Sequence, residues 1–285
     1  MNRIGILTDE VYPDNFAKSL DWIVEQQLSH IEIRVVDGVN IANMNDEQVA
    51  EVRRQVEAKG LSITAIASPV YKCALDPSRP VASGDVFGQA EESVEAHHAK
   101  LARVIAIAKL LGTKNIRIFS FWREVEPELY FEEIVAHLKK AAALAEQEGV
   151  LLLQENEPSC NGGFAAEVGK IVRAVNSPAM KALWDPGNEA HGGRSAFPEG
   201  YDAVKDVLAH VHIKDAYTLP DGSGRCVPVG SGNVPFIPQL QALQRDGYTG
   251  LFTIETHYKP EGGSKAAGSR ITLDALRVLA AEAGL

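Results

Sequence analysis

Short β-branched segments alternate eight times with longer segments of helical period, and this alternation constrains the fold more than any other feature of the chain. Segments such as HIEIRV (residues 30–35) have the length and composition of buried strands. Segments such as residues 16–28 place apolar residues three and four positions apart, as helices with one packed face do. Repeated strand–helix units form parallel sheets. Eight such units in 285 residues predict an α/β fold of the (β/α)₈ TIM barrel type.

The expected elements cover the chain without a linker or a low-complexity stretch, so we expect a single domain over residues 1–285. The expected strands cover residues 3–8, 30–35, 62–67, 115–121, 150–155, 180–185, 210–215 and 251–257. The expected helices cover residues 16–28, 46–59, 91–111, 130–148, 165–175, 201–208, 235–245 and 268–283. A doubly wound open sheet is the alternative. The first turn disfavours it, because TDEVYPDN lacks the glycine-rich phosphate motif of that fold.

Composition and charge exclude several classes of protein. Hydrophobic residues at 45% and charged residues at 23% exclude disordered and fibrous chains. The net charge of −10 lacks the basic excess typical of nucleic-acid binding, so we expect no nucleic-acid partner. Cys73, Cys160 and Cys226 are widely separated, as in proteins with reduced thiols. With no apolar run suited to a signal peptide or a membrane helix, we expect a cytoplasmic protein without a membrane partner.

Polar side chains alternate with apolar ones inside the expected strands. In residues 210–215, Val211 and Ile213 share one face, whereas His210, His212 and Lys214 share the other. In a barrel, the apolar face packs against helices and the polar face points inward. By the same alternation, the following side chains also point inward: Glu32, Arg34, Arg117, Thr253, Glu255 and His257.

Four successive expected strands each bring one potential metal ligand to the carboxyl end. These residues are Glu155, Asp185, His212 and Glu255. Three carboxylates and one imidazole suit one divalent metal ion such as Mn²⁺, Mg²⁺, Co²⁺ or Zn²⁺. Without a cation, the carboxylates would repel one another and one would take up a proton. Any one of these residues alone is more often a cap or a hydrogen-bonded core residue, so the prediction depends on all four.

The strand-end segments resemble the xylose isomerase-like barrel superfamily over essentially the whole chain. More narrowly, they are similar to its sugar phosphate isomerase/epimerase group, which contains tagatose 3-epimerase-like enzymes, hydroxypyruvate isomerases and inosose dehydratases. The segments that carry the resemblance are LLLQEN (151–156), ALWDPGN (182–188), HVHIKDA (210–216), PVGSGNVPF (228–236) and GLFTIETHY (250–258).

The resemblance implies roles for the four candidate ligands. Glu155, Asp185, His212 and Glu255 fall on the family's metal-ligand positions, and the two glutamates fall on the acid/base positions of its epimerase branch. The implied reaction is isomerisation or epimerisation of a sugar or sugar phosphate through a metal-stabilised enediolate. That branch commonly has a histidine where this chain has Asn188, and His191 follows further along. Dehydration of an inosose or related polyol at the same metal site therefore stays open as the alternative.

Other side chains near the expected strand ends have two interpretations each. Each of them could bind a small sugar substrate or could form a salt bridge within the barrel mouth. These residues are Arg34, Lys72, Arg117, Asn188, Lys214 and His257. Trp122 and Trp184 either wall the pocket or pack in the core, and residues 230–233 form either a phosphate site or a turn.

Two interpretations of the whole protein are more distant. A phosphodiesterase of the endonuclease IV type is disfavoured by the net charge of −10 and the short loops. A metal-free binding protein on a barrel scaffold is disfavoured by the intact ligand set. Because barrels of this kind often pair through their helices, a homo-oligomer is also open.

Overall fold

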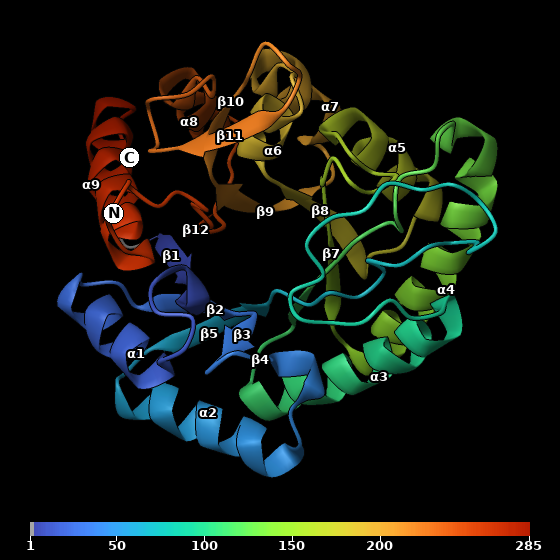
Figure 1. The fold of residues 1–285 in the computed structure, drawn as a ribbon, viewed down its shortest axis with the longest axis horizontal. Coiled ribbons are helices and arrows are strands. Elements are labelled where there is room, and N and C mark those ends of the chain that lie inside the picture. The colour runs from blue at the N-terminus through green and yellow to red at the C-terminus, as the bar shows by residue number, and fades with distance from the viewer. Residues whose placement is uncertain (1–2) are drawn as a thin grey trace.

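A computed structural model describes residues 3–285, and its centre is a closed barrel of eight parallel strands (Figure 1). The barrel strands are β1 (Ile4–Leu7), β2 (His30–Ile33), β5 (Ser62–Ile66), β6 (Asn115–Ile118), β7 (Leu151–Glu155), β8 (Met180–Trp184), β9 (Leu208–Ile213) and β12 (Phe252–Ile254). Around the barrel they run in the order β1–β12–β9–β8–β7–β6–β5–β2. The sheet closes because β1 pairs with both β2 and β12. The predicted fold class is therefore confirmed.

Helices surround the barrel (Figure 1), and all of them except the short helix over residues 186–191 were expected from the sequence. They are α1 (Phe16–Glu25), α2 (Asp46–Ala58), α3 (Val94–Leu111), α4 (Phe131–Glu148), α5 (Ala165–Val175), α6 (Pro186–His191), α7 (Tyr201–Val204), α8 (Phe236–Arg245) and α9 (Lys265–Glu282). Local sequence sets their ends. Asn45 and Gln48 form a capping box before α2, and Gly112 ends α3 with a left-handed φ of 77°. Among residues 3–285, no helix has both the length and the apolar character needed to span a bilayer.

The region around β9 differs most from the expected elements. The helix expected over residues 201–208 ends at Val204, and β9 begins at Leu208, two residues before the expected strand. Beyond β9, strand β10 (Asp215–Thr218) pairs antiparallel with β11 (Gly224–Val227) outside the barrel sheet. Alternation in the sequence did not indicate this hairpin, because its residues are neither uniformly apolar nor strictly alternating.

The loop at residues 228–234 folds around the carboxylate of Asp215. Its Oδ2 atom accepts hydrogen bonds from the backbone amides of Gly230 and Gly232, each at 2.8 Å. Its Oδ1 atom accepts a third from Val234 at 3.1 Å. These amides are occupied by a side chain of the protein itself, so the turn interpretation of residues 230–233 holds in preference to a phosphate site.

The apolar core lies between the barrel and its helices. Val211 and Ile213 are fully buried there, which confirms the predicted outward face of β9. Trp184 is also fully buried, and its ring centroid lies 5.6 Å from that of Tyr201 in α7. The core interpretation therefore holds for Trp184. Trp122 is 3% exposed and donates a hydrogen bond to Glu91.

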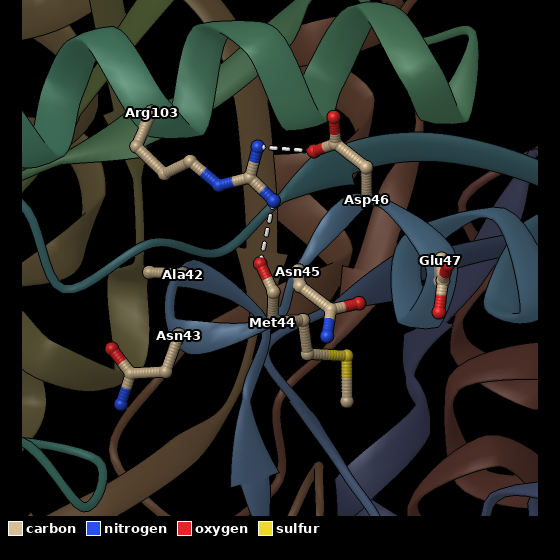
Figure 2. A pocket seen from close by; sticks show the side chains of 7 residues that line it. All are labelled: Ala42, Asn43, Met44, Asn45, Asp46, Glu47 and Arg103. Atoms are coloured by element: carbon tan, nitrogen blue, oxygen red, sulfur yellow. Dashed lines mark hydrogen bonds and ion pairs between the residues drawn. The ribbon is translucent and has the colours of Figure 1, made fainter.

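A hollow of about 720 Å³ lies on the outside of the barrel, where α2 begins beside α3 (Figure 2). Arg103 of α3 spans it, with Nη1 2.5 Å from Asp46 Oδ1 and Nη2 2.5 Å from the carbonyl oxygen of Met44. These contacts fix the start of α2 against α3. The lining residues are Ala42, Asn43, Met44, Asn45, Asp46, Glu47 and Arg103, and they include no predicted site residue.

Gly187, the second residue of α6, allows the end of β8 to approach the end of β9. A Cβ atom at this position would lie 2.6 Å from the backbone carbonyl carbon and oxygen of Lys214. Real Cβ atoms do not come so close to backbone atoms, because the electron shells overlap. The absent side chain of Gly187 thus sets the spacing between Asp185 and Lys214, two of the predicted site residues.

We expect Gly187→Ala to force these two strand ends apart and to lower the free energy of unfolding by about 1–3 kcal/mol. Urea denaturation followed by circular dichroism measures this loss. Gly5→Ala in β1 is the matched control, because the nearest atom to its new Cβ would lie at 3.2 Å and a smaller loss is expected. Equal losses in the two variants would contradict this explanation of Gly187.

Candidate metal centre

The four predicted ligands converge at the carboxyl end of the barrel. Glu155 ends β7, Asp185 follows β8, His212 lies in β9 and Glu255 follows β12. These four strands are consecutive neighbours in the sheet, so their ends share one sector of the mouth. One ligand atom from each residue lies within 4.8 Å of the other three, and each residue is at most 2% exposed.

His212 presents one ring nitrogen to the other candidate ligands. Its Nδ1 atom lies 3.2 Å from Glu155 Oε1 and 2.9 Å from Glu255 Oε2. Its Nε2 atom faces the other way and lies 3.1 Å from Glu32 Oε2. Burial by itself lowers the pKa of His212, but these three carboxylates outweigh that effect and raise the pKa well above its ordinary value.

Asp185 is a candidate ligand whose charge the protein balances incompletely. Its Oδ1 atom accepts a hydrogen bond from the amide of Asn188 at 3.0 Å. Its Oδ2 atom accepts no directed hydrogen bond, although Lys214 Nζ lies 2.9 Å away. Burial raises the pKa of Asp185, and the charges of Glu155 and Glu255 add to this effect against the opposing charge of Lys214. A further positive charge beside Asp185 would therefore be favourable.

The donor set fits a divalent cation. Carboxylate oxygens and one imidazole nitrogen are ligands that Mn²⁺, Mg²⁺, Co²⁺ and Zn²⁺ accept in proteins. A cation among the four residues would offset the mutual repulsion of the three carboxylates, which contributes to the raised pKa of Asp185. Glu155, Asp185, His212 and Glu255 are thus the residues that could hold it.

Three predicted substrate-binding cations form ion pairs with these carboxylates. Arg34 Nη1 lies 2.5 Å from Glu255 Oε1, and Arg117 Nη1 lies 3.1 Å from Glu155 Oε2. Lys214 pairs with Asp185 as described. Salt bridges are therefore present for Arg34, Arg117 and Lys214, each at most 4% exposed, and their predicted contact with substrate stays a prediction. Burying such charges is tolerable only because each has a partner.

Lys72 and Asn188 are bound to other parts of the protein. Lys72 Nζ donates to the carbonyl of Asp85 at 2.9 Å and lies 3.4 Å from Glu157 Oε2. The side-chain amide of Asn188 donates to the carbonyl of Asn156 at 2.7 Å. The structure thus shows structural partners for both side chains. Their predicted contact with substrate stays a prediction.

His257 is the predicted site residue that reaches furthest towards solvent. Its side chain is 36% exposed, and its Nε2 atom lies 3.4 Å from Glu255 Oε1. Its backbone amide donates to Glu10 Oε2 at 2.9 Å. Glu10 also pairs with Arg34 at 2.8 Å, as does Asp9. Asp9 and Glu10 directly follow β1 in the sequence TDE, and this position at a strand end was the signal that could have identified them.

Phe87 covers the cationic side of the mouth and was not predicted. It lies in the segment between β5 and α3, residues 67–93, which contains no long helix or strand. Its ring centroid is 4.4 Å from Lys72 Nζ, 4.8 Å from Arg34 Cζ and 5.0 Å from Arg117 Cζ. Cations are attracted to aromatic faces at such distances. Loop residues have no periodicity, so the sequence held no signal for this contact.

A buried hydrogen-bond network holds the backbone of Asp185. The side chain of Asn156 accepts from the amide of Asp185 at 2.8 Å and donates to its carbonyl at 2.9 Å. Asn156 Nδ2 also lies 3.2 Å from Glu189 Oε1, which accepts from the amide of Ala165 at the start of α5. Burial raises the pKa of Glu189 to about 7. This network joins the end of β8 to α5 and α6.

Sequence comparisons place the chain among known proteins. A family model described as xylose isomerase-like TIM barrel matches residues 20–281. An inosose dehydratase of Geobacillus thermodenitrificans is 20% identical over 258 residues, which cover 83% of this chain and 83% of that protein. An uncharacterised protein of Methanocaldococcus jannaschii is 30% identical over 140 residues. That match covers 45% of this chain and 47% of the archaeal protein, less than half of its length.

Solved structures with the same barrel include two sugar epimerases. The 3-keto-D-glucoside 4-epimerase of E. coli has a TM-score of 0.70 at 19% identity, covering 98% of this chain and 100% of its own. The D-psicose 3-epimerase of Clostridium cellulolyticum, solved with D-tagatose, has a TM-score of 0.67 at 15% identity. The match covers 99% of this chain and 96% of that protein. A xylose isomerase-like protein of Mycobacterium smegmatis, solved with magnesium, has a TM-score of 0.67 at 19% identity. The match covers 93% of this chain and 88% of that protein. At these identities the likeness establishes the fold alone.

We expect Glu189→Gln to change how stability depends on pH. A carboxyl group with a raised pKa holds its proton more tightly in the folded protein, so it destabilises the fold as pH rises from 4.5 to about 7. Above that pH the penalty is on the order of 3 kcal/mol. Glutamine keeps the acceptor oxygen and has no proton to lose. The stability of the variant relative to wild type should therefore rise across this window.

Urea denaturation between pH 4.5 and pH 8 measures the difference between the two proteins. Glu199→Gln is the control, because a hydrogen bond from Ser195 lowers the pKa of that exposed carboxyl group and its effect is complete above 4.5. Its difference from wild type should stay flat over the same window. A flat difference for Glu189→Gln as well would contradict the raised pKa.

Proposed function

The chain belongs to the xylose isomerase-like TIM barrel family, and we propose that it is a divalent-metal-dependent enzyme that isomerises or epimerises a sugar or sugar phosphate. The observation that carries the proposal is the convergence of Glu155, Asp185, His212 and Glu255 on one buried point at the barrel mouth. The two sugar epimerases with the same barrel support the class of reaction, and the magnesium complex supports a divalent cation.

The chemistry needs both a cation and a pair of carboxylates. A hydrogen on a carbon next to a carbonyl is too weakly acidic for an unaided carboxylate to remove. A divalent cation held by Glu155, Asp185, His212 and Glu255 would supply the positive charge that stabilises the negative charge formed on the carbonyl oxygen as the proton leaves. We assign the proton transfers to Glu155 and Glu255, one removing a proton and the other returning one. Asp185 and His212 serve as ligands only.

Two proton-transfer groups at one site are compatible with two outcomes. Glu155 and Glu255 approach His212 Nδ1 from strands on either side of β8 and β9. A proton returned to the opposite face of the same carbon inverts that centre, which is epimerisation. A proton returned to the neighbouring carbon interconverts aldose and ketose.

The buried cations keep Glu255 ionised. Burial by itself raises the pKa of Glu255, but Lys214 and His212 outweigh that effect and hold it well below its ordinary range. An ionised carboxylate is the form that a general base requires. For substrate binding we favour His257 among the predicted residues, since its ring is exposed and lies 3.4 Å from Glu255.

Dehydration of an inosose or related polyol is the second candidate function. The relative from Geobacillus thermodenitrificans, an inosose dehydratase, matches 83% of this chain and so supports it. The same cation and the same first proton transfer would serve, but a hydroxyl group on the next carbon would leave as water. Asn188, at a position where the epimerase branch commonly has histidine, is compatible with this alternative.

The cysteines bear on the compartment in which the enzyme works. Cys73, Cys160 and Cys226 are free thiols, and the first two are buried, which supports a reducing cytoplasmic location. We propose that residues 1–285 act as one domain on a small sugar-derived substrate, as a monomer or a homo-oligomer.

Removal of the cation by a chelator should abolish turnover, and Mn²⁺ should restore it. The substrate class is tested with ketoses, ketose phosphates and inososes in D₂O containing Mn²⁺, with the products followed by NMR and mass spectrometry. Deuterium at one carbon without loss of water supports an isomerase or epimerase, whereas loss of water supports the dehydratase. Turnover that survives complete metal removal would contradict the proposal.

Glu255→Gln should lower turnover at least about 100-fold, because glutamine cannot take or return a proton. Glu124→Gln is the matched control, since Glu124 is also buried but pairs with Arg79 at 3.1 Å, outside the set of candidate ligands. Its turnover should stay near that of wild type. Near-normal turnover of Glu255→Gln would show that the proton-transfer pair is assigned wrongly.

A further inference from the structure

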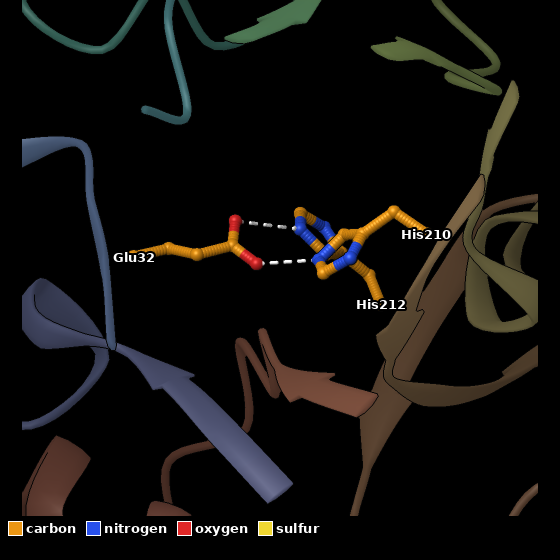
Figure 3. A group of neighbouring side chains, drawn as sticks. All are labelled: Glu32, His210 and His212. Atoms are coloured by element: carbon orange, nitrogen blue, oxygen red, sulfur yellow. Dashed lines mark hydrogen bonds and ion pairs between the residues drawn. The ribbon is translucent and has the colours of Figure 1, made fainter. Parts of the chain in front are cut away.

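A second cluster of polar side chains lies inside the barrel and shares His212 with the candidate metal centre (Figure 3). Glu32 reaches from β2 across the interior towards two histidines on β9. Its Oε1 atom lies 2.5 Å from His210 Nε2, and its Oε2 atom lies 3.1 Å from His212 Nε2. All three side chains are at most 5% exposed.

The contact with Glu32 determines which ring nitrogen of His212 carries a proton. A carboxylate can only accept hydrogen bonds, so the Nε2 atom of His212 must carry a proton to donate to it. A ring nitrogen that carries a proton has no lone pair for a metal ion. Nδ1 also faces carboxylates, but these belong to Glu155 and Glu255, which are themselves candidate ligands. A cation bound among them would take the place of a proton on Nδ1, whereas Glu32 would keep the proton on Nε2.

We propose that Glu32 is a positioning residue that holds the Nε2 proton of His212 and thereby directs Nδ1 towards the divalent cation. This inference rests on the proposed function, because it assumes that the cation binds. Carboxylates behind metal-bound histidines commonly fix the ring and strengthen its bond to the metal.

His210 completes the arrangement by holding the other oxygen of Glu32. With one oxygen bound to each histidine, the carboxylate plane of Glu32 is fixed in the barrel interior. Both oxygens of Glu32 thus lie within hydrogen-bond distance of a histidine ring nitrogen, and neither is left free to turn towards another partner.

The same three residues have the composition of a second metal site, and the geometry favours the positioning role. Glu32, His210 and His212 offer one carboxylate and two imidazole nitrogens. Direct contacts of 2.5 and 3.1 Å already satisfy both carboxylate oxygens without an ion between the partners. A second ion at this cluster is therefore an outcome that the experiment must be able to reveal.

The first test identifies the nitrogen that binds metal in the wild-type protein. The full chain with ¹⁵N-labelled histidine is loaded with ¹¹³Cd²⁺, and the coupling between cadmium and nitrogen is measured by NMR. We expect coupling to Nδ1 of His212, with a proton retained on Nε2. Coupling to Nε2, or a second cadmium ion bound by His210, would overturn the proposal. This test needs no variant of Glu32.

The second test removes the charge of Glu32 while keeping its shape. The glutamine side chain introduced by Glu32→Gln has a single carbonyl oxygen, which cannot accept from both rings as the carboxylate does. We expect the dissociation constant for Mn²⁺, measured by calorimetry, to rise about 10- to 100-fold. Glu124→Gln, which removes a buried carboxylate outside the cluster, should leave it unchanged.

The outcomes separate this inference from the proposed function. If wild type binds Mn²⁺ and Glu32→Gln binds it within twofold of wild type, the positioning role is overturned and the proposed function stands. If wild type binds no divalent cation, both are overturned. If Glu32→Gln does not fold, the cadmium measurement on wild type decides.

Discussion

The pairing of β1 with β12 closes the sheet, and the rest of the site depends on this closure. In a closed parallel barrel all eight carboxyl ends face one mouth, so residues far apart in the sequence become neighbours. Glu155 and Glu255 are separated by 100 positions yet lie within the same 4.8 Å cluster. An open sheet would leave its two edge strands far apart, and Asp9 and Glu10 after β1 would not reach the region beyond β12.

Charge balance is the second constraint, because the mouth concentrates carboxylates in a buried place. Arg34, Arg117 and Lys214 each pair with a candidate ligand, and together they allow the carboxylates to remain there. The balance is incomplete at Asp185, whose pKa is raised. The arginines and the lysine therefore offset part of the negative charge of the carboxylates. A further cation beside Asp185 would be favourable, as expected of a metal site.

Periodicity in the sequence predicted the barrel and the four converging residues, because alternation assigns each strand residue to a face and parallel strands share their ends. It also placed Glu32 and His210 inward. It could not pair them, because contacts across the interior depend on the three-dimensional register of the strands. The ring of Phe87 lies in a loop, and the hairpin of β10 and β11 and the helix that carries Glu189 are too short to show a periodic pattern.

The segment over residues 67–93 that carries Phe87 belongs to none of the strands that supply the candidate ligands. Substitutions of Phe87 would reshape the entrance, whereas the ends of β7, β8, β9 and β12 are supplied by other parts of the chain. Descendants of one ancestral barrel could therefore diverge in the molecules they admit while keeping the reactive centre intact. The segment that admits the substrate and the strand ends that carry the candidate ligands are thus free to evolve at different rates.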